Sequence, residues 1–387
     1  MKKVAVVTGT RADWGLLSPV AKALCGNSSV NVAVIATNMH LDPTYGDTLA
    51  EIRADGFTIE ATVPMRATGD SGAETAAAMA RCAAGMVDAF VKVNPDMILI
   101  LGDRYEMLAV ASVATVMRIP IIHIAGGEIS EGAIDDNIRH AITKLSSLHL
   151  VATETYRQRV IAMGEQPDSV INTGAIGVHN ILNSPLMSRS QLAESVGFDI
   201  DADTLLVTMH PATRDDRSTA ESVEALLSAL NLFPDKKILI TYPNNDADGR
   251  VIIRAIERYA AENPSRVKIV PSLGRTRYLS ALKYVAAVVG NSSSGIVEVP
   301  SMHIPTVDIG IRQRGRIAAP SVIHCDPDTN SIARAISLAL SPSGRSMARE
   351  AVNPYYQPDT LTKMVDAIVK ADPAKMQIKK FYDLPRQ

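Results

Sequence analysis

Apolar runs and helical stretches alternate along this chain almost from one end to the other. In the first half, short apolar runs predict strands at 3–8, 32–36, 58–63, 97–101, 119–124 and 148–152. Runs such as MILIL (97–101) have no polar side, which is what burial on both faces of a parallel sheet requires. Between the runs lie helical patterns, of which AAAMARCAAGMVDAFVKV (76–93) is the clearest. The first half is therefore expected to form a parallel sheet with connecting helices.

The second half repeats this scheme. Apolar runs predict strands at 204–210, 236–243, 266–272, 286–293 and 304–310, each followed by a loop and a helical stretch. Alternating β and α elements of this kind predict parallel sheets with helices on both faces. The expected fold class is α/β, with two doubly wound domains.

The join between the halves lies near TGAIGVHNILNSP (173–185), where strand patterning lapses. We therefore expect a Rossmann-like domain over 1–176 and a second, nucleotide-binding one over 177–355. A last helical stretch, TLTKMVDAIVKA (360–371), follows a proline-bearing loop, and residues 356–387 are expected to return to the first domain. Ligands of such domains bind beyond the carboxyl ends of the strands, so two domains that face each other predict a cleft.

Composition narrows the function classes. The 387 residues are 47% hydrophobic and 21% charged, with a net charge of −2, which is typical of a globular protein that binds neither nucleic acid nor an anionic membrane as its main partner. The apolar run in MKKVAVVTGTRADWG is too short for a signal peptide, and no run approaches the roughly 18 apolar residues of a membrane span. Three separated cysteines suit reduced thiols, so we expect a cytoplasmic protein.

Two strand-end loops have the features of phosphate sites. TGTRADWG (8–15) offers backbone amides at a helix start and the permanent cation of Arg11, although a plain turn would look the same. GNSSSGIVEVP (290–300) offers small residues and serine hydroxyls for a diphosphate, with Glu298 placed to accept ribose hydroxyls. A capped helix with a Ser and Glu capping box is the alternative for the second loop. We favour nucleotide binding for the second loop because it lies on the edge of the predicted cleft.

A third loop, VTMHPATRDD (207–216), places His210 where a strand stops, which suits a role at a phosphate or a leaving group. The segment NNDADG (244–249) lacks the spaced ligands and distal Glu of a calcium loop. No group of His, Cys and carboxylate residues has metal spacing, so we predict no metal and no cofactor.

Carboxylates gather after two strands of the first half. LILGDRYE (99–106) places Asp103 and Arg104 just past an interior strand, and HIAGGEISEGAIDDNIRH (123–140) releases Glu128, Glu131, Asp135 and Asp136 after the next. Loops after neighbouring parallel strands converge, and paired carboxylates split their pKa values into one base and one acid. A helix beginning near Ile134 would put Arg139 on the face of Asp135, ready for that carboxylate or for a phosphate. Helix capping is the alternative for Asp103.

As an ordered set, these motifs resemble the hydrolysing UDP-N-acetylglucosamine 2-epimerases of the sialic-acid pathway, over essentially the whole chain. The resemblance rests on TGTRADWG, MHLDPTYGDTLAEI, LGDRYE, HIAGGE with GAIDDNIRHAITKLSSLH, VTMHPAT, GNSSSGIVEVP and DIGIRQRGR. It implies a GT-B glycosyltransferase-like fold. It also implies that UDP is eliminated across C1 and C2 of the sugar, and that water then adds to the glycal to release N-acetylmannosamine.

The resemblance also implies residue roles. Asp103 and Asp135 match catalytic carboxylates of the family. The expected substrate-binding residues are Arg11, Arg104, Arg139, His210, Ser292, Ser293, Gly295, Glu298 and Arg312. Many members read H-I-E-G-G-E where this chain has Ala125, which cannot transfer a proton, so Glu128 is the expected replacement.

Several expectations follow for function. The partner is a nucleotide sugar, the assembly a homodimer or homotetramer, and the product a precursor of sialic-type acids. Ala125 leaves open a modified substrate, a UDP- or GDP-linked 2,4-diacetamido-2,4,6-trideoxy sugar of legionaminic acid synthesis. A GT-B glycosyltransferase, which would need an acceptor, and a non-catalytic nucleotide-sugar sensor are the alternatives from other classes.

Overall fold

The structure is a computed structural model that describes residues 1–43, 46–65, 69, 71–212, 217–244 and 248–384. Parts of three loops quoted above, at 44–45, 213–216 and 245–247, lie outside the described residues. The chain divides into two compact units. The first comprises residues 1–128, 135–179 and 355–387, and the second comprises 129–134 and 180–354.

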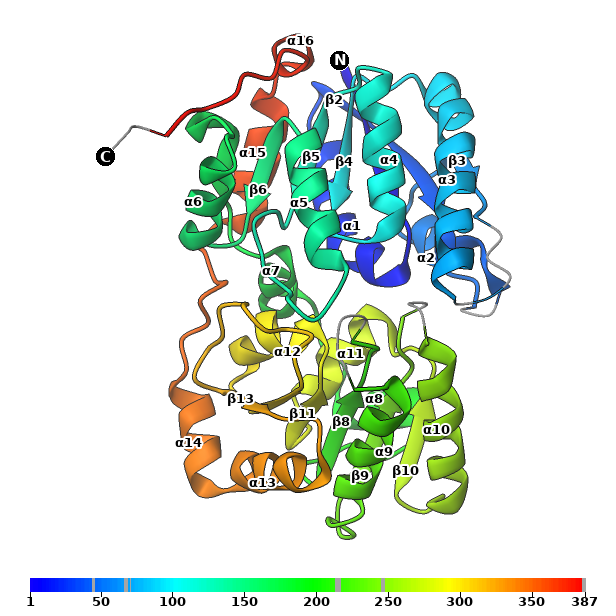
Figure 1. Cartoon of the computed structure of the whole chain (residues 1–387), viewed down its shortest axis with the longest axis vertical. Helices are drawn as coiled ribbons and strands as arrows, with labels where there is room; N and C mark the ends of the chain where they lie inside the picture. Colours follow the sequence, from blue (N-terminus) through cyan, green and yellow to red (C-terminus); the bar gives the residue numbers. More distant parts are fainter. Residues whose placement is uncertain (44–45, 66–68, 70, 213–216, 245–247, 385–387) are drawn as a thin grey trace. The chain divides into compact units, whose positions relative to one another are not determined.

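The first unit is built on a 7-stranded parallel sheet in the order β3-β2-β1-β4-β5-β6-β7 (Figure 1). Its strands are β1 (Lys2–Thr8), β2 (Val30–Thr37), β3 (Ile59–Val63), β4 (Met97–Leu101), β5 (Ile121–Ile124), β6 (Leu148–Val151) and β7 (Val170–Asn172). The helices are α1 (Arg11–Cys25), α2 (Leu49–Ala54), α3 (Gly72–Val93), α4 (Tyr105–Val116), α5 (Asp135–Leu145), α6 (Glu154–Ala162), α7 (Ile176–Asn183, which crosses the unit boundary), α15 (Thr360–Lys370) and α16 (Pro373–Met376). Short 3-10 turns are η1 (Asn38–Leu41) and η3 (Pro167–Ser169).

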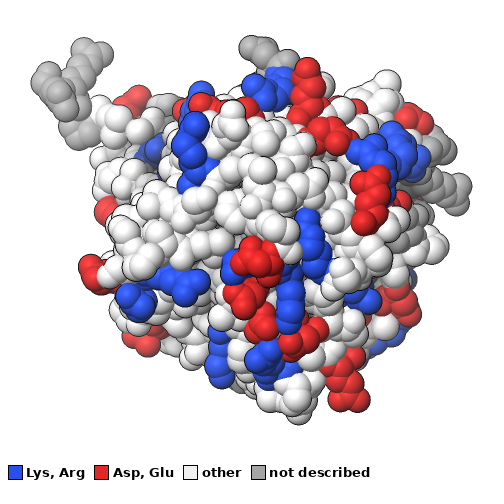
Figure 2. All heavy atoms as spheres, turned by 90° about the horizontal axis from the view of Figure 1, so that it is seen from below, with Lys and Arg blue, Asp and Glu red and all other residues white. Residues whose placement is uncertain are grey.

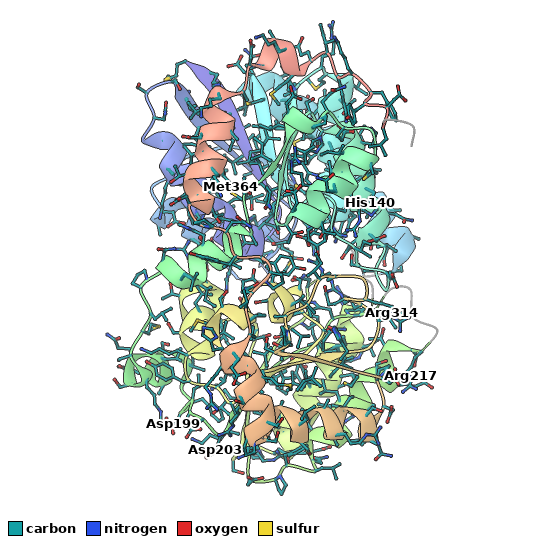
Figure 3. The ribbon with its side chains drawn as sticks, turned by 90° about the vertical axis from the view of Figure 1, so that its left-hand side faces the viewer. His140, Asp199, Asp203, Arg217, Arg314 and Met364 are labelled. Carbon is teal, nitrogen blue, oxygen red and sulfur yellow. The ribbon has the colours of Figure 1, made fainter. Side chains whose placement is uncertain are left out.

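Alternate residues of each central strand serve opposite faces of this sheet. Ala5 and Val7 of β1 pack with α3, α4 and α5, whereas Val4 and Val6 pack with α1 and α15. Burial on both faces explains why the strands are apolar throughout. Met364 of α15, labelled in Figure 3, is fully buried on the α1 face, so the chain's last long helix belongs to this unit's core.

The second unit has a 6-stranded parallel sheet in the order β10-β9-β8-β11-β12-β13. Its strands are β8 (Thr204–Thr208), β9 (Lys237–Thr241), β10 (Val267–Val270), β11 (Ala287–Gly290), β12 (Thr306–Ile309) and β13 (Val322–Cys325). The helices are α8 (Arg189–Val196), α9 (Thr219–Leu230), α10 (Gly249–Glu262), α11 (Gly274–Leu282), α12 (Ser293–Val297), α13 (Thr329–Leu340) and α14 (Pro342–Glu350), with the 3-10 turn η4 (Val299–Met302). α9, α10 and α13 cover one face, and α8 and α11 cover the other.

Two strands, β7 and β13, were not expected from the sequence. Each is at the edge of its sheet and each is only partly buried. β7 is only three residues long, and β13 carries the exposed His324 between Ile323 and Cys325, so neither presents a continuous apolar run. The expected α/β class with two parallel, doubly wound sheets is confirmed.

The surface of the second unit shown in Figure 2 carries charges of both signs side by side among the coloured residues. The second unit also has an ion-pair network in which Arg189 and Lys237 both contact Asp199 and Asp201 at 2.8–3.2 Å. Asp199 is labelled in Figure 3. Exposed pairs of this kind contribute little to stability, about 0–1 kcal/mol each. Among the described helices, none is long and apolar enough to cross a membrane.

Candidate functional site

In the first unit, the candidate residues lie just beyond the carboxyl ends of three neighbouring strands, β1, β4 and β5. Arg11 begins α1, Asp103 and Arg104 lie between β4 and α4, and Glu128 follows β5. Parallel strands bring such loops to one edge of a sheet. Asp103 and Glu128, which the sequence placed after neighbouring strands, therefore lie at the same edge of this sheet.

Asp103 is held by a buried arginine. The Arg139 side chain is 1% exposed and its Nη2 donates to Asp103 Oδ2. Its Nη1 donates to the carbonyl of Glu128 at 3.0 Å and to Asp136 Oδ1 at 3.4 Å. The Asp103 side chain keeps 22% of its surface exposed. Arg139 was expected to pair with Asp135 or to meet a phosphate; in the structure it contacts Asp103 and the Glu128 carbonyl and so joins the loops after β4 and β5.

His123 forms a hydrogen bond to the backbone of the loop that carries Asp103. Its Nε2 lies 2.7 Å from the carbonyl of Gly102, which can only accept, so this nitrogen carries the proton. Burial lowers the pKa of His123 to about 3, so the imidazole is neutral at physiological pH. His123 therefore acts as a hydrogen-bonding strut for the backbone that precedes Asp103.

The Gly-Gly pair after β5 has a steric cause. Gly127 has φ +79°, and a Cβ there would lie 2.7 Å from the Tyr156 carbonyl oxygen. A Cβ on Gly126 would lie 3.1 Å from both His123 Nδ1 and Thr143 Oγ1. Ala125, just before the pair, has φ +67°, a left-handed conformation that only glycine adopts without cost. This turn is tightly constrained, and it leads directly to Glu128.

Glu128 and Asp135 flank a segment that clusters with the other unit. Glu128 is 5% exposed and Asp135 is the first residue of α5. Residues 129–134 between them were assigned to the first domain from sequence but belong to the second unit. There the Glu131 amide donates to the carbonyl of Arg314 at 3.1 Å, and a Cβ on Gly132 would lie 2.6 Å from the Ile311 backbone. Because this segment joins Glu128 directly to Asp135, its conformation affects the positions of both carboxylates.

The two remaining candidate arginines of the first unit, Arg11 and Arg104, also have carboxylate partners. Arg11 Nε lies 2.9 Å from Glu51 Oε1 of α2, and both side chains are partly exposed. Arg104 Nε donates to Glu106 Oε1 at 2.8 Å, and its guanidinium lies 5.6 Å from the Tyr105 ring centroid. Both arginines are therefore oriented within their own unit.

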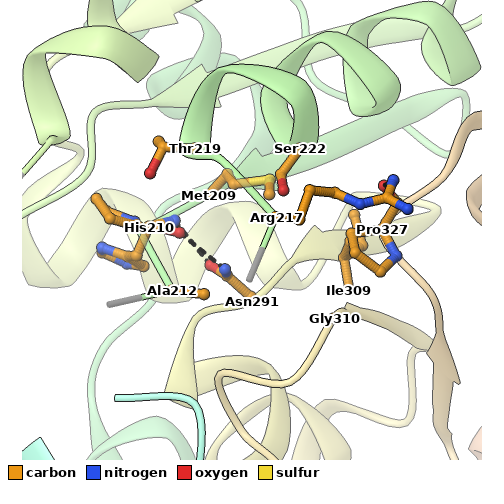
Figure 4. A pocket seen from close by; sticks show the side chains of 11 residues that line it. Met209, His210, Ala212, Arg217, Thr219, Ser222, Asn291, Ile309, Gly310 and Pro327 are labelled. Atoms are coloured by element: carbon orange, nitrogen blue, oxygen red, sulfur yellow. Dashed lines mark hydrogen bonds between the residues drawn. The ribbon is translucent and has the colours of Figure 1, made fainter. Parts of the chain in front are cut away.

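In the second unit, His210 follows β8 and is clamped by Asn291, which follows β11. The His210 amide donates to Asn291 Oδ1 at 2.7 Å, and Asn291 Nδ2 donates back to the His210 carbonyl at 2.8 Å (Figure 4). The Asn244 amide donates to His210 Nδ1 at 3.2 Å. Because Nδ1 accepts, a neutral His210 carries its proton on Nε2 and can donate there.

A hollow lies beside this clamp. Eleven residues line it, including His210, Asn291 and Arg217 (Figure 4). The carbonyl of Asn291 accepts from Arg312 Nη1 at 3.3 Å and from Gln313 Nε2 at 2.9 Å. Asn291 therefore joins three loops, although it was not among the expected site residues. Its place inside the GNSSSG motif was the available signal.

The serine loop does not form the capping box that was the alternative to nucleotide binding. Ser292 is the N-cap residue of α12 and Ser293 its first residue, but the Ser292 side chain makes no capping hydrogen bond. Glu298 lies at the other end of this five-residue helix, so the two do not form a capping box. Both serines and Glu298 are partly exposed. The hydroxyls are thus placed to meet a ligand, although so short a helix adds little dipole.

Gly295 has a packing role. A Cβ there would lie 2.7 Å from Thr306 Cγ2, and the Gly295 carbonyl accepts from Thr306 Oγ1 at 2.9 Å. It was expected to contact substrate, whereas the structure buries it against β12. Close by, Ser294 Oγ and Tyr278 Oη are 2.6 Å apart. Burial raises the pKa of Tyr278 and the charge of Glu298 adds to the rise, so this hydroxyl stays protonated.

Among the described residues, no group of three or more His, Cys, Asp or Glu side chains is arranged to hold a metal ion.

Known proteins that are similar to this chain in sequence or in fold include several 2-epimerases of nucleotide sugars. The family model described as UDP-N-acetylglucosamine 2-epimerase matches residues 22–369. A Campylobacter jejuni protein named GDP/UDP-N,N'-diacetylbacillosamine 2-epimerase (hydrolyzing) is 36% identical over 86% of each chain. The Escherichia coli polysialic acid biosynthesis protein P7 is 35% identical over 100% of this chain and 98% of its own. The crystal structure of a UDP-GlcNAc 2-epimerase from Neisseria meningitidis bound to UDP-GlcNAc superposes with a TM-score of 0.80 at 16% identity, covering 95% and 100% of the two chains.

Proposed function

Because this chain belongs to the UDP-N-acetylglucosamine 2-epimerase family, in its hydrolysing group, we propose that it is a nucleotide-sugar 2-epimerase that hydrolyses its substrate. It eliminates a nucleoside diphosphate from a 2-acetamido sugar and hydrates the glycal that forms. The observation that carries the proposal is the Arg139–Asp103 pair, which presents a part-exposed, oriented carboxylate at the strand-end edge of the first unit.

In the first step, a carboxylate takes the proton from C2 of the sugar. The C2–H electron pair becomes the C1=C2 double bond, and the C1–O bond breaks with its electrons passing to the diphosphate. Asp103 is the base we assign, since Arg139 and the His123-supported loop hold it in place. Orientation of this kind supplies much of the rate of a proton transfer.

The leaving diphosphate needs donors. His210 offers Nε2–H, and the loop at Ser292 and Ser293 offers hydroxyls and backbone amides. Arg11 and Arg312 add permanent positive charge, while Glu298 is assigned to the ribose hydroxyls. Donors that are already oriented stabilise developing negative charge without reorganising.

In the second step, water adds to C1 and a proton is delivered to C2 on the face opposite to the one that lost it. The product is the free sugar with inverted C2. Glu128 and Asp135 are the candidates for the acid and for the base that activates water. Ala125 offers no carboxyl, so Glu128 is the nearer substitute along the chain.

Two sugars are candidates. Relatives from Campylobacter jejuni and Legionella pneumophila, each 36% identical, are named for N,N'-diacetylbacillosamine, and a Neisseria meningitidis relative at 32% is named UDP-N-acetylglucosamine 2-epimerase. Ala125 distinguishes this chain from the Glu-bearing pattern. We therefore place the UDP-linked 2,4-diacetamido-2,4,6-trideoxy sugar first and UDP-N-acetylglucosamine second. Either product would supply a sialic-type acid synthesis.

The test is turnover of a panel of UDP- and GDP-linked amino sugars in heavy water, followed by proton NMR. Release of nucleoside diphosphate and of a 2-epimeric sugar deuterated at C2, without an acceptor, supports the proposal. Activity only with an acceptor would indicate a glycosyltransferase, and binding without turnover would indicate a sensor.

Two variants test the residue roles. Asp103→Asn is expected to lower turnover by at least about 1,000-fold, since it removes the base but keeps the side-chain shape, while UDP affinity stays within about threefold. Glu128→Gln is expected to lose most activity, and Ala125→Glu in that background should restore part of it. Full activity of Asp103→Asn would contradict the assignment, and full activity of Glu128→Gln would make Glu128 structural.

A further inference from the structure

A buried carboxylate that the mechanism does not use lies at the start of α4. Glu106 is fully buried; its Oε1 accepts from Arg104 Nε at 2.8 Å, while its Oε2 is covered and has no hydrogen-bond partner. Its carboxyl group lies against Gly9, where a Cβ would collide with it. Glu106 of α4 is therefore directed at the loop that follows β1. A buried oxygen without a hydrogen bond is destabilising, which points to a role for Glu106 beyond packing.

A second carboxylate comes to the same place from α1. The Asp13 amide donates to the N-cap oxygen Thr10 Oγ1 at 3.1 Å, and the Asp13 Oδ2 atom is covered without a partner. Burial raises the pKa of Asp13 to about 7; the charge of Arg104 opposes this rise and the charge of Glu106 adds to it. Asp13 is thus half protonated near neutral pH, which is unusual for an aspartate at a helix N-terminus.

The other titratable groups around this cluster hold fixed charges at neutral pH. Burial lowers the pKa of His40 to about 4 and raises that of the Cys82 thiol to about 12, so both are neutral. Arg11, on the same helix as Asp13, is paired with Glu51. Of these three described groups with shifted pKa values, Asp13, His40 and Cys82, Asp13 alone changes charge near pH 7.

We propose that Asp13 and Glu106 form a carboxyl pair that positions Arg104 for the anionic substrate, and that it does so only while the pair holds one proton. The proposal rests on the proposed function, since it concerns the same strand-end site. With the proton on Asp13, the charges of Arg104, Glu106 and Asp13 sum to zero. When Asp13 ionises, the second negative charge draws Arg104 away from the substrate and repels its diphosphate. Asp13 and Glu106 are positioning residues that act through Arg104.

The test is the pH dependence of kcat/KM between pH 5.5 and 9, using the full chain and the sugar that the panel selects. For the wild type, kcat/KM should fall about 30-fold from pH 6 to pH 8.5 with the slope of one proton, and kcat should change much less. In Asp13→Asn this fall should shrink to about threefold or less. Glu106→Gln should move the fall to lower pH, because the charge that helps raise the pKa of Asp13 is gone.

Glu74→Gln is the matched control, since Glu74 holds the same third position of α3 behind its N-cap Ser71. It should keep the wild-type pH profile. A second readout needs no substrate: because burial raises the folded-state pKa of Asp13, its stabilising contribution is present below the unfolded pKa and is lost as pH rises through about 7. The Tm of Asp13→Asn should match the wild type near pH 4 and exceed it at pH 8.5.

Persistence of the alkaline fall in Asp13→Asn, in an otherwise active wild type, would overturn this inference and leave the proposed function standing. A wild type that turns over no nucleotide sugar would overturn both. A fall confined to kcat would also contradict it, since positioning of Arg104 acts on substrate capture.

Discussion

The two units have the same kind of fold, but different chemical groups hold their strand-end loops together. In the first unit, the loops after β1, β4 and β5 carry ionised side chains, with Arg139 buried beneath Asp103 and Arg104 paired with Glu106. In the second unit, the loops after β8 and β11 are joined by neutral groups, chiefly the amide of Asn291 and the backbone of His210. In the function we propose, the first edge transfers protons and the second binds the anionic diphosphate.

The difference has energetic consequences. A buried charge that loses its partner costs about 3–5 kcal/mol, whereas a lost neutral hydrogen bond costs about 1–3 kcal/mol. The first edge should therefore be intolerant of single changes, in fold as well as in chemistry. The second should lose ligand affinity before it loses its fold.

The largest effect is expected for Arg139→Met. Asp103 then loses its cation and the Glu128 carbonyl loses a donor, so we expect about 3–5 kcal/mol of lost stability and at least about 1,000-fold lower turnover. Urea unfolding and nucleoside diphosphate release measure the two. Arg258→Met is the control, because its pair with Glu224 is about half exposed and its loss should leave stability and turnover nearly unchanged. A stable, active Arg139→Met would contradict the claim that the first edge depends on buried charge more than the second does.

A smaller effect is expected for Asn291→Ala. Two hydrogen bonds to the His210 backbone disappear. We therefore expect about 1–3 kcal/mol of lost stability and a UDP affinity weaker by about 10- to 100-fold. Calorimetric titration with UDP measures the affinity. Asn291→Asp keeps the acceptor for the His210 amide but loses the donor, and should fall between. If kcat fell more than the affinity, Asn291 would belong with the chemistry of the first unit.

The smallest effect is expected for Ala125→Gly. Glycine adopts a φ of +67° without cost, so relief of strain should outweigh the added unfolded-state entropy and stabilise the protein by about 0.5–1 kcal/mol. Urea unfolding again gives the measurement. A loss of stability instead would show that the Ala125 methyl is worth more in packing than its backbone costs.

The sequence predicted the fold well but predicted few of the contacts between site residues. Central strands, the α/β class and the family followed from apolar runs and ordered motifs, and these are confirmed. The edge strands β7 and β13 did not, because neither presents a continuous apolar run. The roles of the site residues, the sugar and the assembly stay predictions.

Local pattern by itself determined which residues lie at strand ends, since burial on both sheet faces dictates runs of apolar side chains whose limits can be read directly. Tertiary structure alone decided what those residues meet. Arg139 shares a helix with Asp135, and that spacing was visible in the sequence. Nothing in the sequence showed that Arg139 would contact Asp103, which lies 36 positions earlier in the chain. The same holds for Asp13 and Glu106, which approach because β1 and β4 pair in the sheet although 88 residues lie between Thr8 and Met97. Charge interactions depend on distance and burial, and both are properties of the folded sheet edge rather than of any one segment.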